Sequence, residues 1–200
     1  MGMFNSSWFQ RDEVAPPGVS PTGMDTAPAA IGVQDSPPPV EPELAREPLW
    51  VIYASETGVA EHLAQDASRA LQDAGVASRL LSFDQLKLDT LQGIGSALLL
   101  VSTCYDGDPP DMAEEFFREH MQQPASLSRL GYGMLALGDS YYDEFCGFGR
   151  RLKHWLQASG AHAWFEPVEM DDEDAAATRL WRERIGAVIQ RRRDARQSSR

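Results

Sequence analysis

Short apolar runs alternate with amphipathic segments along the chain from residue 49 onward. Runs of strand length occupy residues 49–54, 79–83, 97–102, 132–137 and 163–168. Continuous apolar runs of this length, ended by glycine or polar turn residues, are typical of strands buried on both faces of a parallel sheet. The pattern therefore predicts five strands, of which the third is the most apolar.

Between the runs, apolar residues recur every three or four positions, as on the buried side of a helix. The predicted helices cover residues 60–74, 111–121, 145–156 and 175–190, and Gly75 is placed to end the first of them. Alternation of strands and helices favours a parallel sheet covered by helices on both faces. The predicted fold class is α/β, a three-layer sandwich with a five-stranded parallel sheet in the order 2-1-3-4-5.

The two ends of the chain differ from the middle in composition. Residues 1–47 hold eight of the thirteen prolines and show no sustained apolar period, which predicts a disordered Pro-rich tail. Residues 191–200 contain five arginines and one aspartate, and we expect a solvated basic tail there. The folded domain should then span residues 48–190, which is long enough to bury one core.

The formal net charge of −12 narrows the function classes. An acidic domain repels nucleic acid and favours basic partners. No stretch approaches the roughly 18 apolar residues of a membrane span, and the N-terminus lacks a signal-peptide core, so neither membrane insertion nor export is expected. Cys104 and Cys146 have no CxxC spacing and no neighbouring histidine, so no metal site is predicted. Their usage fits a reducing cytoplasm.

Three loops follow the first, third and fourth predicted strands, whose carboxyl ends should meet at one edge of the sheet. The first loop, residues 55–60, leads into a helix whose N-terminal N–H groups and partial positive charge suit a phosphate. Ser55 and Thr57 add hydroxyl groups, and Gly58 lets the backbone approach closely. The loop lacks the lysine of a P-loop NTPase and the GxGxxG of a dinucleotide fold. On its own it fits an ordinary Ser- or Thr-capped helix equally well.

The other two loops carry aromatic residues in turn-rich segments where no core requires them. Tyr105 lies in the segment 101–110, and Tyr141 and Tyr142 lie in the segment 137–147. Aromatic side chains of this kind could stack on a flat, electron-poor ring such as the isoalloxazine of a flavin. An offset aromatic stack contributes roughly 0.5–1.5 kcal/mol beyond the burial of area. The alternative is that one or both tyrosines of the third loop simply cover it.

Together the three loops resemble the flavodoxin family. They are similar to the FMN domains of diflavin reductases, including sulfite reductase flavoprotein and cytochrome P450 reductase, and to short flavodoxins of the MioC type. The resemblance covers about residues 49–190 and implies a flavodoxin-like fold. The matching motifs are Ala54-Ser55-Glu56-Thr57-Gly58, Ser102-Thr103 through Gly107-Asp108-Pro109-Pro110, and Leu137-Gly138-Asp139-Ser140 with Tyr142 and Phe145-Cys146-Gly147.

The resemblance implies FMN as the cofactor and assigns residues to it. The phosphate would be held by Ser55, Glu56, Thr57, Gly58, Val59 and Ala60. One side of the ring would be bordered by Ser102, Thr103, Cys104, Tyr105, Asp106 and Gly107. Tyr142 would stack on the other side. The pocket would be completed by Leu137, Gly138, Asp139, Phe145, Cys146, Gly147 and Asp171.

Two positions of the second loop depart from the family pattern. Cys104 stands where the reductases often have an aromatic residue, and Tyr105 stands where they often have glycine. In flavodoxins a peptide of this region can flip to form a hydrogen bond with the reduced flavin ring. The flip requires a positive φ, which glycine adopts without a steric cost. Tyr105 therefore predicts that the half-reduced flavin is stabilised less than in flavodoxins with glycine here.

The function implied by the resemblance is an FMN-binding electron-transfer protein that shuttles electrons between a reductase and an acceptor protein. The acidic surface leads us to expect basic redox partners, such as an NADPH-dependent flavoprotein reductase and an electron acceptor. Two alternatives stay open. One is an FMN-dependent oxidoreductase subunit of a sulfite-reductase-like or quinone-reducing system, and the other is a flavin-free scaffold. A carrier or component is expected rather than a self-sufficient enzyme, since no NADPH or FAD domain follows residue 200.

Overall fold

The computed structural model describes residues 42–171 and 174–198, and these contain one parallel sheet. Its strands are β1 (Leu49–Ala54), β2 (Ser78–Ser82), β3 (Ser96–Ser102), β4 (Gly131–Leu137), β5 (His162–Ala163) and β6 (Val168–Met170). The strand order is β2-β1-β3-β4-β5, with β6 also paired to β4. The predicted α/β class and the order 2-1-3-4-5 are confirmed.

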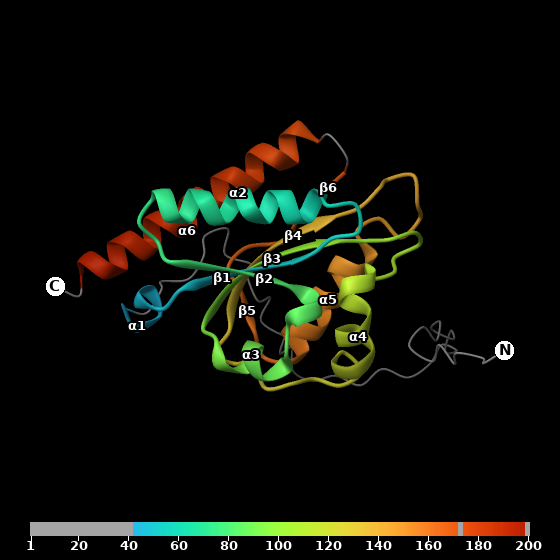
Figure 1. Ribbon diagram of the computed structural model, residues 1–200, viewed down its shortest axis with the longest axis horizontal. Coiled ribbons are helices and arrows are strands. Elements are labelled where there is room, and N and C mark those ends of the chain that lie inside the picture. The colour runs from blue at the N-terminus through green and yellow to red at the C-terminus, as the bar shows by residue number, and fades with distance from the viewer. Residues whose placement is uncertain (1–41, 172–173, 199–200) are drawn as a thin grey trace, which may run out of the picture. The chain divides into compact units, whose positions relative to one another are not determined.

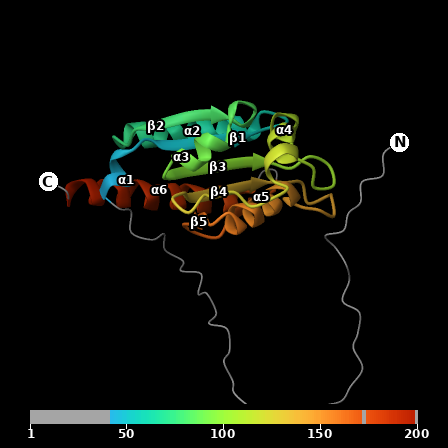
Figure 2. The same ribbon diagram turned by 90° about the horizontal axis from the view of Figure 1, so that it is seen from below.

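Helices cover both faces of the sheet. They are α1 (Pro42–Arg46), α2 (Val59–Asp73), α3 (Leu88–Gly93), α4 (Asp111–His120), α5 (Gly147–Ala158) and α6 (Ala175–Gln197), with a 3-10 turn at Phe83–Gln85. Figure 1 shows α2 and α6 above the sheet and α3, α4 and α5 below it. Figure 2, turned by 90°, shows the strands lying side by side along the sheet. No helix within residues 42–171 and 174–198 is long and apolar enough to cross a membrane.

Successive residues of the central strands β1 and β3 point into two separate apolar cores. In β1, Val51 packs in the core that contains Trp181 of α6, whereas Ile52 packs in the core that contains Phe148 of α5. Every residue of β3 is buried, as expected for a central strand covered on both faces. The two cores hold the sheet between its helices, and the carboxyl ends of β1, β3 and β4 reach the same edge.

The predicted strand 163–168 is wrong in its middle, because β4 pairs with two short strands and not with one. β5 pairs at Gly131 and Tyr132, and β6 pairs at residues 135–137. The chain bulges between them to place Trp164 and Phe165 against glycines of β4. A Cβ on Gly133 would lie 2.5 Å from the Phe165 ring, so the ring occupies the space that a strand side chain would need.

Helix α6 continues to Gln197, so residues 191–197, predicted as a solvated tail, are helical, and Arg193, Asp194 and Gln197 are exposed. Arg192 is fully buried, and its Nη1 donates to the Glu47 carbonyl at 2.8 Å. Arg196 Nε donates to the Ala45 carbonyl of α1 at 2.7 Å. These guanidinium groups satisfy carbonyls that the end of a helix leaves unpaired. The domain therefore includes α1, whereas the rest of the Pro-rich segment, residues 1–41, lies outside the described residues.

Two glycine-to-alanine substitutions should shift stability in opposite directions. A Cβ on Gly149 of α5 would lie 2.5 Å from Ala136 Cβ, so Gly149→Ala should lower the free energy of unfolding by about 1–3 kcal/mol. A Cβ on Gly186 of α6 would meet no neighbouring atom within 4 Å, so Gly186→Ala should raise it by about 0.5–1 kcal/mol. Urea unfolding measures both, and equal losses in the two variants would contradict close packing of α5 on β4.

Candidate functional site

The three predicted loops meet at the carboxyl edge of β1, β3 and β4. The Thr103 N–H of the second loop donates to the carbonyl of Leu137, where the third loop begins, at 2.9 Å. The Glu56 carboxylate of the first loop accepts from the Cys104 thiol at 3.5 Å and from the Asp111 N–H at 3.4 Å. Each loop is thus hydrogen-bonded to a neighbouring one, and the three form one continuous surface.

The first loop exposes the N-terminus of α2. Gly58 occupies the N-cap position with φ 91°, and no side chain within residues 42–171 and 174–198 caps the first turn of the helix. Ser55 Oγ instead accepts from the Gly58 N–H at 2.9 Å, which closes the loop on itself. The alternative of an ordinary Ser- or Thr-capped helix therefore does not hold, since the N–H groups of the first turn are left for an anion.

The second loop is a tight turn closed by a reciprocal pair of hydrogen bonds. Cys104 N–H donates to the Asp108 carbonyl and Asp108 N–H donates to the Cys104 carbonyl, both at 2.8 Å. The turn needs two left-handed residues, Tyr105 with φ 44° and Gly107 with φ 97°. Tyr105 is 74% exposed. Thr103 Oγ1, at the base of the loop, is buried without a hydrogen-bond partner among the described residues, so a bound polar group could satisfy it.

The third loop is ordered by the backbone and side chain of Asp139. Its carboxylate accepts from the Tyr141 N–H at 2.8 Å, and its carbonyl accepts from the Tyr142 N–H at 3.1 Å. Tyr141 is 88% exposed, whereas Tyr142 is half-buried. Asp171, which follows β6, accepts from the Ser140 N–H at 3.3 Å and so lies at this loop.

Glycines let the second and third loops touch through their backbones. A Cβ on Gly147 would lie 2.7 Å from Gly107 Cα, and a Cβ on Gly138 would lie 2.6 Å from the Cys146 nitrogen at the far end of the same loop. Neither neighbour is a flexible side chain that could move aside. Any other residue at Gly147 would push the two walls of the site apart, and one at Gly138 would displace the end of the third loop.

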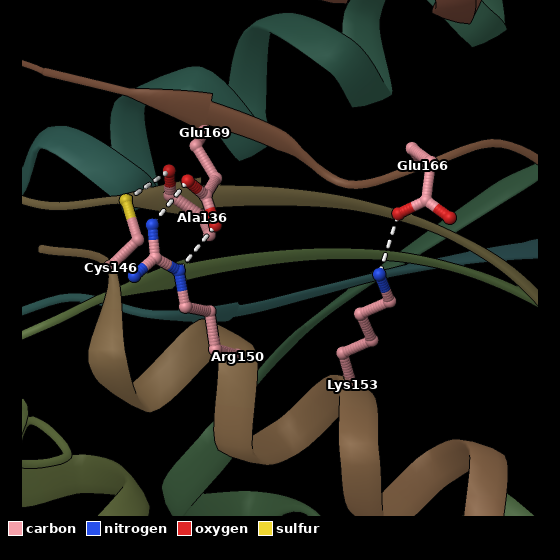
Figure 3. A network of polar contacts seen from close by, with 6 residues as sticks. All are labelled: Ala136, Cys146, Arg150, Lys153, Glu166 and Glu169. Carbon is pink, nitrogen blue, oxygen red and sulfur yellow. Dashed lines mark hydrogen bonds and ion pairs between the residues drawn. The ribbon is translucent and has the colours of Figure 1, made fainter.

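Several predicted site residues lie behind the loops, with their side chains in the core. Among the buried ones are Ala60, Ser102, Leu137 and Cys146. Cys146 has φ 54° and turns its thiol to the Ala136 carbonyl of β4 at 3.2 Å, as Figure 3 shows. Phe145 lies half-buried beneath the Arg150 guanidinium, 6.0 Å from its ring centroid. Such residues can offer a ligand their backbone more readily than their side chains.

Helix residues complete the site in ways that the loop motifs did not indicate. Met112 Sδ of α4 accepts from the Ser55 N–H at 3.1 Å, and Arg151 of α5 donates to the Gly107 carbonyl. Both contacts join residues more than forty positions apart. Nothing local in the sequence marks either residue. Across residues 42–171 and 174–198, no group of three His, Cys, Asp or Glu side chains is placed to hold a metal ion.

Both cysteines are free thiols that stay protonated at neutral pH. Burial, followed by the Glu56 carboxylate, raises the pKa of the Cys104 thiol to about 12. Burial raises the pKa of the Cys146 thiol to about 12 as well. Because the thiolate is the reactive form, neither cysteine is activated for redox or nucleophilic chemistry.

Alkylation should reveal this protonation. At pH 8, the Cys104 thiol should react with iodoacetamide at least roughly a hundred times more slowly than a free cysteine, because its pKa lies far above the usual value near 8.5. Glu56→Gln removes one cause of the raised pKa and should speed labelling at Cys104 while Cys146, as the internal control, keeps its rate. Mass spectrometry of the labelled peptides reports both sites, and ordinary reactivity of Cys104 in the unmodified protein would disprove the assignment.

Comparison with known proteins identifies the family. The flavodoxin family model matches residues 51–181. Similar curated proteins include the α-component of the NADPH sulfite reductase flavoprotein from Bacillus subtilis, 33% identical over 155 residues, and from Vibrio cholerae, 31% identical over 144 residues. The matches cover 76% and 70% of this chain but 25% and 23% of those proteins, so the chain spans about a quarter of their length.

Solved flavodoxin structures share the fold. A cysteine-to-serine variant of flavodoxin from Pseudomonas aeruginosa superimposes with a TM-score of 0.62 at 22% identity, covering 74% of this chain and 99% of that one. Flavodoxin from Streptococcus pneumoniae gives a TM-score of 0.58 at 21% identity, covering 77% of this chain and 100% of that one. With well over half of its length matched by the family model, the chain belongs to the flavodoxin family as a flavodoxin-type FMN-binding electron-transfer domain.

Proposed function

We propose that this protein shuttles electrons between an NADPH-dependent flavoprotein reductase and an acceptor protein, with one FMN held by the three loops. The observation that carries the proposal is the meeting of an uncapped helix N-terminus with two aromatic-bearing loops at one edge of the sheet. The flavin supplies the redox chemistry when bound, and the protein supplies binding, orientation and electrostatics.

The first loop would bind the FMN phosphate without any cationic side chain. The first turn of α2 offers backbone N–H groups and the positive end of the helix dipole. Thr57 is exposed beside Gly58, so its hydroxyl can donate as well. Ser55 Oγ accepts from the Gly58 N–H and so shapes the loop, and its own O–H can still donate to a phosphate. Glu56 would brace it, because its carboxylate already joins Cys104 and Asp111.

The second and third loops would hold the ring between them. The Tyr105 and Asp106 N–H groups make no hydrogen bond to another residue in the described part of the chain, so they are available to the polar edge of the ring. Thr103 Oγ1 provides one more unsatisfied polar atom. Tyr142 is half-buried and is the better stacking candidate of the tyrosine pair, since Tyr141 projects into solvent. The two loops therefore fit both a polar edge and an apolar face.

Many carboxylates lie in and beside these loops. The acidic residues at this edge are Glu56, Asp106, Asp108, Asp111, Asp139, Asp143, Glu144 and Asp171. They would lower the reduction potential of a bound flavin, because reduction adds negative charge to a negative surrounding. They would also steer a basic partner toward the site at a salt-dependent rate.

A second candidate function follows from the curated relatives. Because the similar proteins are α-components of NADPH sulfite reductase, this chain could act as the FMN-dependent subunit of a related multi-component oxidoreductase. The electron donor and acceptor would then be fixed partners in one assembly. Two free cysteines fit a reducing compartment such as the cytoplasm in either case.

Electron transfer between proteins should depend on both a reductase and salt. The purified full chain, loaded with FMN, should bleach slowly with NADPH alone and quickly once an NADPH-dependent flavoprotein reductase is added. Transfer onward to a basic haem protein such as cytochrome c should slow at least about tenfold from low to high ionic strength, because salt screens the carboxylates. Stopped-flow absorbance measures each step.

A neutral quinone serves as the control acceptor, since its reduction should not depend on salt. A rate to cytochrome c that is flat in salt would contradict electrostatic steering. Rapid quinone reduction with NADPH and no reductase would instead support an enzyme. A colourless protein that binds no added FMN would overturn the carrier proposal.

Tyr105 should limit how the site responds to reduction. A non-glycine residue in the left-handed region costs about 1–2 kcal/mol, and Tyr105 has φ 44°. Tyr105→Gly removes this cost, so the loop can change conformation more easily when the flavin is reduced, and the two one-electron potentials should separate further. Tyr105→Ala is the matched control, because it removes the ring and keeps the backbone cost. Spectroelectrochemical titration that found the same separation in both variants would refute the role of backbone strain.

A further inference from the structure

Two consecutive arginines in the first turns of α5 reach different parts of the domain. Arg150 makes a bidentate ion pair with Glu169 of β6, at 2.7 and 2.8 Å, seen in Figure 3. Arg151 instead donates from Nη2 to the carbonyl of Gly107 in the second loop. Of the two, Arg151 links helix α5 to a loop of the candidate site, whereas Arg150 links it to the sheet.

The Arg151 guanidinium lies between the second loop and α4. Its Cζ is 5.4 Å from the ring centroid of Phe117, a cation–π distance. Phe117 in turn contacts Phe148 of α5 edge to face, with centroids 6.2 Å apart. The aromatic platform restricts the guanidinium, so its hydrogen bond to Gly107 has a defined direction, unlike that of a free surface arginine.

The Gly107 carbonyl is the point at which the loop can be controlled from behind. The peptide between Gly107 and Asp108 is held at both ends, because its carbonyl accepts from Arg151 and its N–H donates to the Cys104 carbonyl. Glu144 also packs at this point, since a Cβ on Gly107 would lie 3.0 Å from Glu144 Cβ and 3.5 Å from Arg151 Nη1. Without Arg151, the Gly107 carbonyl would lose its side-chain donor, and the turn would keep the Cys104–Asp108 hydrogen bonds and the backbone contact with Gly147.

We propose that Arg151 is a positioning residue that sets the conformation of the loop 104–108, and with it the direction of the Tyr105 and Asp106 N–H groups toward the flavin. The inference rests on the proposed function for the identity of the ligand. The contact itself is a property of the chain without cofactor. Arg151 also adds a cation beside a carboxylate-rich edge, so position and charge must be separated by experiment.

Three variants of the full chain separate them. Arg151→Gln removes the charge and most of the reach to Gly107, whereas Arg151→Lys keeps the charge. Arg150→Gln is the matched control, because it removes the same charge from the adjacent residue and leaves the Gly107 bond in place. The measurements are amide hydrogen exchange of the FMN-free protein, the FMN dissociation constant by fluorescence quenching, and the reduction potentials of the loaded protein.

In Arg151→Gln, the Cys104 and Asp108 amides should exchange about tenfold faster than in the unmodified protein, and in Arg150→Gln they should be unchanged. The FMN dissociation constant should rise about tenfold in Arg151→Gln, or about 1.4 kcal/mol, with partial recovery in Arg151→Lys. If the tenfold loss of affinity affects only one redox state of the bound FMN, the one-electron potential that involves this state shifts by about 59 mV.

Unchanged exchange at Cys104 and Asp108 in Arg151→Gln would overturn the proposal, whatever the cofactor does. Equal changes in FMN affinity and potential in Arg150→Gln and Arg151→Gln would also overturn it, because they would show an effect of charge alone. A protein that binds no FMN would refute the proposed function. The exchange comparison would still decide whether Arg151 holds the loop.

Discussion

A side chain at Gly147 would place its Cβ 2.7 Å from the Gly107 backbone, so the second and third loops meet there with no room for a side chain between them. This close approach of two loop backbones is the constraint on which the rest of the site depends. It brings the turn after β3 against the start of α5, so both walls of the site are fixed by main-chain contact. The side chains of the loops can then project away from the contact and toward a ligand. The fold contributes by ending β3 and β4 in register, which aligns the two loops before any ligand arrives.

The same constraint explains why the meeting of the three loops at one edge could be predicted from the sequence. Apolar runs in the sequence predict the buried strands. In a parallel sheet, the loops that follow neighbouring strands then lie at the same edge. Glycines in those loops match the family pattern because the backbone requires glycine there. Gly58 and Gly107 have positive φ, and Gly138 has no room for a Cβ. Their placement could be inferred without knowing a single side-chain contact.

Features that depend on long-range contacts could not be inferred in this way. The strand 163–168 has an apolar pattern throughout, yet it breaks because Phe165 finds space over Gly133. Arginines near the C-terminus suggest a solvated tail, yet Arg192 is buried and donates to the carbonyl of Glu47, the residue that follows α1. Arg151 acts on a residue 44 positions away, and its local pattern is that of any exposed helix position. Each of these contacts joins two residues that are far apart in the sequence. The local pattern around one residue does not indicate which distant residue it will contact.

The distribution of charge favours transfer to a protein over conversion of a small molecule. The first loop holds no lysine or arginine, so phosphate binding there would depend on helix N–H groups and would add no cation to the acidic edge. An acidic edge attracts a basic macromolecule over a distance of about 10 Å at ordinary ionic strength. Tyr105 and Tyr141 stand exposed at that edge, 74% and 88% accessible, and do not cover it. An enzyme acting on a small substrate gains by excluding water from its site, whereas a carrier must leave the edge of its cofactor open to a partner. The open, acidic edge of this domain meets the second requirement.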